Sequence, residues 1–216
     1  MRLPAEWHHW HHGVLALAET LSTYHGKSIL VIDADAQPWL AEAGSTYDIV
    51  LIDSAPGLSV LTECFLREAS FYLSPTKPHY ISTRGLKFLR EFKERDPQMG
   101  FAENLGVVIN MKDLRFAQDE QFEEWLRQEP QNRCFRQSIP RVGPLQATGF
   151  VSPHPRSYWA KYPGETGDQL RRLTLELLGR VGGEALDSEE IPASGRKRSE
   201  SKVKAMWGAM KERRVQ

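Results

Sequence analysis

The sequence predicts an α/β fold, with an open and mostly parallel sheet and helices on both faces. Three apolar runs of strand length support this prediction: SILVID (28–33), DIVLID (48–53) and LGVVIN (105–110). Continuous apolar runs are typical of parallel strands that are covered on both sides. Segments of helical period lie between the runs, as βαβ units require. We therefore expect the three runs to be adjacent parallel strands of one sheet, with Asp33 and Asp53 at the same edge.

The other elements are predicted in chain order. Apolar residues recur at helical spacing from Val14 to Leu21, and His25-Gly26 can end that helix because glycine accepts the left-handed cap conformation. The sequence further predicts helices over 58–69, 83–94 and 118–128, strands over 70–74 and 138–140, and a long helix after Asp168.

The chain divides into three predicted parts: an N-terminal segment (1–13), the α/β domain (14–181), and a linker with a basic tail (182–216). Residues 182–201 hold Gly, Ser, Pro and charges without an apolar cluster, which is typical of a flexible linker. Residues 196–214 carry eight Lys or Arg against two Glu. Their apolar residues fall at helical spacing: Val203, Met206, Trp207 and Met210. This pattern predicts a basic amphipathic helix.

Composition limits the class of protein. The formal net charge of the 216 residues is zero, so only a local basic surface could favour a polyanion. No apolar run reaches the roughly 18–20 residues that span a bilayer, and the first residues lack the apolar stretch of a signal peptide. Cys64 and Cys134 form no C-x-x-C pair and are expected to be reduced core residues. These features favour a cytoplasmic protein.

The aspartates at the strand ends are the main chemical candidates. In an open parallel sheet, ligands bind beyond the carboxyl ends of the strands. A carboxylate there can hold Mg²⁺ beside the phosphates of a nucleotide. Asp33 and Asp53 are placed for this role, and Asp35 follows two residues after Asp33. The alternative is that such aspartates only cap the next helix or turn.

Five segments, taken in order, resemble the ParA and MinD partition ATPases, which have a P-loop NTPase-like fold. VIDADAQ (31–37) is similar to their D-x-D-P-Q segment, and YDIVLIDSAPGLSVLT (47–62) to their Walker B strand and the loop after it. SFYLSPTKPHYISTRGLKFL (70–89) resembles a strand that ends in Pro, followed by a helix. LGVVINM (105–111) resembles the strand whose Asn recognises adenine, and SIPRV (138–142) the segment that packs on that base.

The resemblance implies ATP and Mg²⁺ as cofactors. It places Asp53 near magnesium as the Walker B residue, and Asp33 and Asp35 as the catalytic residues that position magnesium and the attacking water. Asn110, Pro140 and Arg141 would border the adenine.

The resemblance also implies partners: a homodimer that ATP closes, a partition partner protein, and DNA or an anionic membrane bound through the tail. The tail residues concerned are Arg196, Lys197, Arg198, Lys202, Lys204, Trp207, Lys211, Arg213 and Arg214. A solvated surface helix is the simpler interpretation of the same tail, and the sequence does not separate DNA from lipid.

The chain departs from the family where the phosphates should bind. The family's K-G-G-x-G-K-[ST]-[ST] loop would fall over residues 5–12, which read AEWHHWHH, with Trp10 at the position of the phosphate-contacting lysine. Only nine residues separate Gln37 from Tyr47, where the family has a strand and a helix. We therefore expect a sheet that lacks a central strand and is incomplete at the N-terminus, from an unusual protein or a truncated or rearranged gene.

The sequence thus leaves two hypotheses of function. The first is a ParA/MinD-like nucleotide-binding protein of partition or cellular positioning, with weak ATP binding and impaired hydrolysis. The second is a non-catalytic interaction module that binds DNA, membrane or a protein. His8, His9, His11 and His12 could share a zinc ion, but a disordered polar terminus is the favoured interpretation.

Overall fold

The computed structural model describes residues 8–33, 46–54, 57–141 and 156–182. Its strands are β1 (Ile29–Asp33), β2 (Ile49–Asp53), β3 (Phe71–Thr76), β4 (Glu103–Lys112) and β5 (Ile139–Pro140). Its α-helices are α1 (His8–His25), α3 (Val60–Glu68), α4 (Tyr80–Arg95), α5 (Ala117–Gln128), α7 (Tyr158–Lys161) and α8 (Glu165–Gly182), with 3₁₀ turns at Pro97–Met99 and Pro130–Asn132. Every strand and helix that the sequence predicts before the linker is present, with ends shifted by a few residues.

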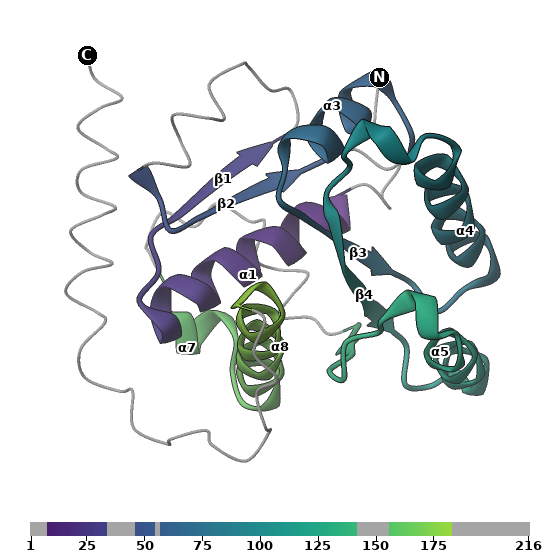
Figure 1. Cartoon of the computed structure of the whole chain (residues 1–216). Coiled ribbons are helices and arrows are strands. Elements are labelled where there is room, and N and C mark those ends of the chain that lie inside the picture. The colour runs from purple at the N-terminus through teal and green to yellow at the C-terminus, as the bar shows by residue number, and fades with distance from the viewer. Residues whose placement is uncertain (1–7, 34–45, 55–56, 142–155, 183–216) are drawn as a thin grey trace, which may run out of the picture.

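The strands are parallel, which confirms the α/β class, but they form two hydrogen-bonded sheets. One sheet is β1-β2 and the other is β3-β4-β5 (Figure 1). The expectation that Leu105–Asn110 lies in one sheet with 28–33 and 48–53 is therefore wrong. Among the described residues no strand joins β2 to β3, as expected for a sheet that lacks a central strand.

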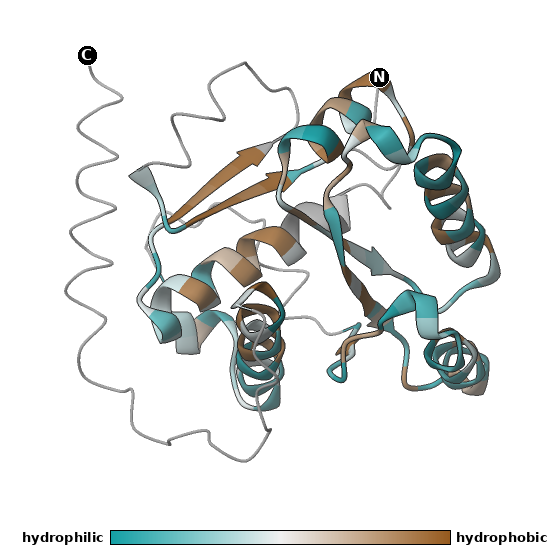
Figure 2. Ribbon diagram, viewed as in Figure 1, coloured by the Kyte–Doolittle hydropathy of each residue, from teal (hydrophilic) through white to brown (hydrophobic). Residues whose placement is uncertain are grey.

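Helices α1 and α8 join the two sheets into one core. Helix α1 packs on β1, β2 and α8, and α8 packs on β4. The core cluster contains residues of both helices, of β4, of β5 with the segment before it, and of α7 with the residue after it: Ala16, Leu21, Leu105, Val108, Phe135, Ile139, Tyr158, Tyr162, Leu170, Leu173 and Leu177. Strands β1 and β2 are hydrophobic along nearly their whole length and cover this core (Figure 2). The burial of these side chains is the main favourable free energy that holds the two sheets together.

Helices cover both faces of the three-stranded sheet. Val108 of β4 belongs to the core cluster with α1 and α8, whereas its neighbours Val107 and Ile109 are buried outside that cluster. Successive side chains of a strand point to opposite faces. Val107 and Ile109 therefore face α4 and α5, which lie on the other side of β3 and β4 (Figure 1).

Two further expectations about single segments need correction. Helix α1 begins at His8, so residues 8–12 are helical and are not part of a disordered terminus. No proline interrupts the chain between Glu6 and Gly13, and the packing of α1 on α8 outweighs the low helix propensity of Gly13. Cys64 is exposed, because it lies on the outer side of α3, and Cys134 is half-buried; both are free thiols. None of the described helices is long and apolar enough to cross a bilayer.

Candidate functional site

The structure places Asp33 and Asp53 side by side. They are register partners at the carboxyl ends of β1 and β2, the last pair of the parallel ladder. Neighbouring strands lie about 4.8 Å apart, so both residues leave the sheet at one point of its edge. Asp53 is half-buried. Carboxylate oxygens are ligands that Mg²⁺ prefers, so the chemistry of this pair fits a magnesium site.

Helix α3 follows β2 in the chain and begins at Val60. Gly57 has a φ of 115°, a conformation that favours glycine. Ser59 then caps α3, where its side chain accepts a hydrogen bond from the backbone N–H of Thr62 at 3.1 Å.

At the opposite end of the same strands, Asp48 fixes their register. Its carboxylate accepts hydrogen bonds from the backbone N–H of Ser28 at 2.7 Å and from the Ser28 hydroxyl at 2.8 Å. These bonds lower the pKa of Asp48 below its ordinary value. The two aspartates therefore differ in position: Asp48, just before β2, joins the starts of the strands, while Asp53 ends β2 at the carboxyl edge.

A second group of predicted residues lies where β4 meets β5. Asn110 pairs with Ile139 and Lys112 pairs with Pro140, so the intervening Met111 forms a bulge with a φ of 58°. The side-chain carbonyl of Asn110 accepts a hydrogen bond from the Met111 N–H at 2.9 Å, which supports this strained conformation. Strain of this kind costs about 1–3 kcal/mol and is commonly found at functional sites.

Helix α1 begins beside Asn110. A Cβ atom added at Gly13 would lie 4.0 Å from the Asn110 side-chain nitrogen. The first turns of α1 therefore adjoin the β4–β5 edge, while the same helix packs on β1 and β2. Asn110 lies in the three-stranded sheet and Asp53 in the two-stranded sheet, so the predicted base-binding and metal-binding residues belong to different sheets.

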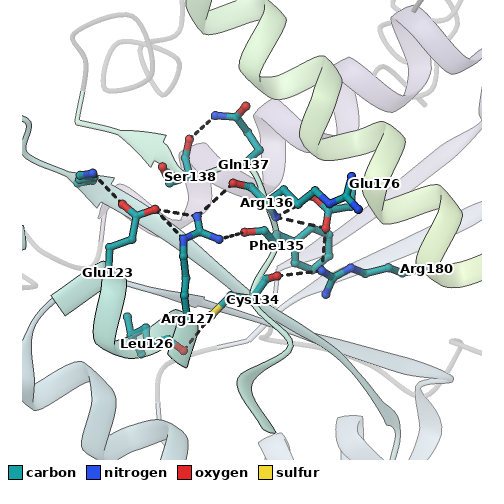
Figure 3. A network of polar contacts seen from close by, with 11 residues as sticks. Glu123, Leu126, Arg127, Cys134, Phe135, Arg136, Gln137, Ser138, Glu176 and Arg180 are labelled. Carbon is teal, nitrogen blue, oxygen red and sulfur yellow. Dashed lines mark hydrogen bonds and ion pairs between the residues drawn. The ribbon is translucent and has the colours of Figure 1, made fainter. Parts of the chain in front are cut away.

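Segment 133–141, which contains β5, is held in place by two arginines (Figure 3). Arg127 of α5 donates to the carbonyls of Phe135 at 2.8 Å and Arg136 at 3.1 Å. It is itself oriented by Glu123, one helical turn earlier, at 2.7 Å. Glu123 also pairs with Lys112 at 2.8 Å, so one carboxylate links the end of β4 to the start of segment 133–141.

Electrostatics favour the ionised form of Glu123. Burial on its own would raise the pKa of this carboxyl group, but hydrogen bonds from Lys112 and Arg127 lower it overall. Lys112 completes the link through its backbone, because its carbonyl accepts a hydrogen bond from the Arg141 N–H at 2.8 Å. Arg141 is exposed, as a residue that borders a ligand would be.

Arg180 of α8 also holds the start of this segment. It donates to the carbonyls of Leu105 at 2.6 Å and Cys134 at 3.0 Å, and pairs with Glu176 at 2.7 Å. Its guanidinium lies 3.8 Å from the centre of the Phe135 ring. An open hollow nearby is lined by Arg127, Glu129, Pro130, Arg133, Cys134 and Arg180. Since its guanidinium groups bond to carbonyls and carboxylates of the chain, we interpret the hollow as structural.

Sequence reasoning missed these supporting residues. The pairs Glu123–Arg127 and Glu176–Arg180 show the i,i+4 spacing of helical ion pairs, which could have singled them out. The carbonyl groups that the arginines contact have no sequence signature. Other predicted residues lie outside the described part of the chain: Asp35 and the tail residues 196–214. The side chains of Asp33 and of His8–His12 also lie outside it.

Comparison with known proteins identifies the fold class. The sequence matches no protein-family model and no curated protein. The structure is similar to cobyrinic acid a,c-diamide synthase from Mycobacterium smegmatis with bound ADP and magnesium, with a TM-score of 0.63 at 15% identity over 87% of this chain and 96% of that one. Two further structures of that synthase, one with a bound ATP analogue and magnesium, match with TM-scores of 0.61 and 0.60 at 15% identity. They cover 84% and 83% of this chain and 93% of each synthase chain. The chain thus has a P-loop NTPase-like α/β fold.

Proposed function

We propose that this protein binds ATP with Mg²⁺ at the carboxyl edge of β1 and β2, as a ParA/MinD-like protein of partition or cellular positioning. One observation carries the proposal: Asp33 and Asp53 end neighbouring parallel strands in register. Structures of similar fold hold ADP or an ATP analogue with magnesium, which supports the same ligand class here. In this proposal Asp53 holds magnesium, and Asp33 and Asp35 position the ion and the attacking water.

We further propose that the base lies at the β4–β5 edge. The exposed Arg141 and the adjoining Pro140 border it, and the Asn110 amide offers a hydrogen-bonding group beside the first turns of α1. The Lys112–Glu123–Arg127 link and Arg180 then keep this edge in a fixed geometry before the ligand arrives, which reduces the free-energy cost of ordering it.

Weak affinity is part of the proposal. Phosphates are usually bound by a glycine-rich loop of N–H groups together with a lysine. Residues 5–12 contain neither glycine nor lysine, and α1 begins at His8. We therefore expect a Kd for ATP in the millimolar range, about −4 kcal/mol, and impaired hydrolysis.

Calorimetry with the full chain tests this. ATP should bind at millimolar concentration with Mg²⁺ and more weakly without it, and Asp53→Asn should remove the effect of Mg²⁺. Asp48→Asn is the matched control, because it makes the same change at the opposite end of β2. The nucleotide proposal is wrong if ATP does not bind, or if the two variants behave alike. Micromolar affinity would show that another segment has replaced the phosphate loop.

The second candidate function is a non-catalytic interaction module. It is favoured by the eight cationic residues of 196–214, which could neutralise the phosphates of DNA or of anionic lipids. Deleting residues 196–216 should then abolish retention on DNA or on anionic vesicles. DNA retention should fall steeply with salt, whereas lipid binding should blue-shift a fluorescence component that Trp207→Phe removes. Unchanged retention on both surfaces would leave the tail as a solvated end.

A further inference from the structure

Helices α4 and α5 carry opposite charges. Helix α4 has five basic residues against two glutamates, a net charge of +3, and α5 has four acidic residues against one arginine, a net charge of −3. Both helices lie on the same face of the three-stranded sheet (Figure 1), and His79, the N-cap of α4, stacks on Phe122 of α5 at 6.3 Å. Together they form one surface with a positive and a negative half.

Several of these charges form no ion pair with another residue of the described part of the chain. Among the described residues Arg84 of α4, and Glu120 and Glu124 of α5, are exposed and form no ion pair. Lys87 pairs only loosely with Glu91, at 3.7 Å. The free positive charges therefore stand on one helix and the free negative charges on its neighbour.

Large apolar side chains are exposed between these charges. Ile81 and Phe88 of α4 are 72% and 58% exposed, and they lie on one side of the helix with Gly85 between them. Nothing lies within 4 Å of a Cβ added at Gly85, so another helix could approach closely there. On the other helix, Trp125 of α5 is 51% exposed and Phe116, the residue before α5, is 56% exposed. Both helices are otherwise largely hydrophilic (Figure 2).

We propose that α4 and α5 form a self-complementary interface between two copies of this chain. In a dimer with two-fold symmetry, α4 of each copy lies against α5 of the other. The same surface of both copies then forms the interface. Each copy then contributes one positive and one negative helix, and both contacts are attractive. The apolar residues fill the centre of the interface and the charges surround it, as in other protein interfaces.

The size of the surface sets the strength of the dimer. Helices of 16 and 12 residues are about 24 Å and 18 Å long, and at about 10 Å width they offer roughly 400 Å² of projected area. Specific interfaces usually bury about 800 Å² per partner. The dimer should therefore be weak, with a Kd in the micromolar range, and should weaken with salt.

Sedimentation velocity of the full chain from about 1 to about 100 µM tests the proposal. The wild type should dimerise, with or without Mg²⁺ and ATP. Arg84→Glu/Lys87→Glu makes both helices negative, and Glu120→Lys/Glu124→Lys makes both positive, so each variant alone should be monomeric. Mixed together, the two variants should form a heterodimer, and one chain with all four changes should dimerise again. The control Arg156→Glu/Arg172→Glu makes the same charge change away from this surface and should behave as the wild type.

The mixing experiment also guards against a folding defect, because misfolded variants would not pair. A wild type that stays monomeric at about 100 µM would overturn the proposal. So would a dimer that both charge reversals leave intact, or folded variants that stay monomeric when mixed. A dimer that forms only with Mg²⁺ and ATP, and that the charge-reversal variants also form, would use another surface. That result would overturn this proposal but support nucleotide binding.

Discussion

Gly106 occupies a backbone position that other residues can fill only by displacing their neighbours. Its φ is 125°, and it lies at the register shift where β4 passes β3. A Cβ atom here would lie 2.1 Å from the carbonyl oxygen of Arg133 and 2.5 Å from a guanidinium nitrogen of Arg180. The absence of a side chain therefore lets segment 133–141 approach β4.

Replacing Gly106 by alanine should consequently lower the free energy of unfolding by about 2–4 kcal/mol, through clash and backbone strain. Gly85→Ala is the matched control. Gly85 lies inside α4 with open space around it, so alanine should stabilise the helix by about 0.5–1 kcal/mol. Urea denaturation of both variants measures the difference, and equal effects would show that the close approach at Gly106 is not real.

His25, the last residue of α1, should make stability depend on pH. Its Nε2 lies 3.1 Å from the Thr174 hydroxyl of α8. Burial, with smaller contributions from Lys27 and Arg171, lowers the pKa of this imidazole below its ordinary value. As the pH falls below about 6.5, the unfolded chain therefore binds more protons at His25 than the native chain does. The free energy of unfolding should then decrease by at most about 1.4 kcal/mol for each pH unit.

This decrease in the free energy of unfolding at low pH should be present in the wild type and absent or smaller in His25→Gln. Glutamine keeps a hydrogen-bonding group but does not titrate near neutral pH. Urea unfolding at a series of pH values between about 5 and 8 gives the comparison. Parallel pH profiles for the two proteins would mean that His25 titrates normally in the folded state.

At the scale of elements, Arg180 shows how one side chain of α8 holds two other segments. Arg180→Lys keeps the charge but loses the planar fork that reaches several carbonyls at once, so the free energy of unfolding should fall by about 1–3 kcal/mol. Arg172→Lys on the same helix changes an exposed residue with one hydrogen bond, to Gln137, and should cost less than about 0.5 kcal/mol. Equal costs would contradict the role given to Arg180.

The elements themselves could be predicted because their patterns are local. Strands β1, β2 and β4 are continuous apolar runs, and α4, α5 and α8 have clear helical periods. Helix α7, with only four residues, is too short for a periodic pattern. The pairing of β4 with β3 and β5 rather than with β2 depends on which strands are available as neighbours, a non-local property that run lengths do not encode.

The candidate site likewise has features with a local sequence pattern and features that depend on contacts between distant segments. Asp33 and Asp53 could be placed together, because equal runs that end in aspartate predict a common edge. The bulge at Met111 could not be predicted, because it depends on the register between β4 and β5. The arginines that fix segment 133–141 could not be predicted either, because they bind backbone carbonyl groups, which every residue has.

At the scale of the whole molecule, α1 and α8 join two parallel sheets. The carboxyl edge of the smaller sheet carries the paired aspartates, and the larger sheet carries the β4–β5 edge. Helix α1 adjoins both. A nucleotide bound along the start of α1 would therefore contact both sheets, with its metal ion at the first and its base at the second.

The central claim is that a nucleotide-bound metal ion lies at the ends of β1 and β2. Paramagnetic broadening by Mn²⁺, used in place of Mg²⁺ with ATP, tests it in amide NMR spectra of the full chain. We expect the Asp33 and Asp53 amides to broaden at lower Mn²⁺ concentrations than Ile29 and Ile49, which lie about 13 Å away at the other ends of the strands. Asp53→Asn should remove this effect. Broadening that spares Asp33 and Asp53, or that persists unchanged in Asp53→Asn, would contradict it.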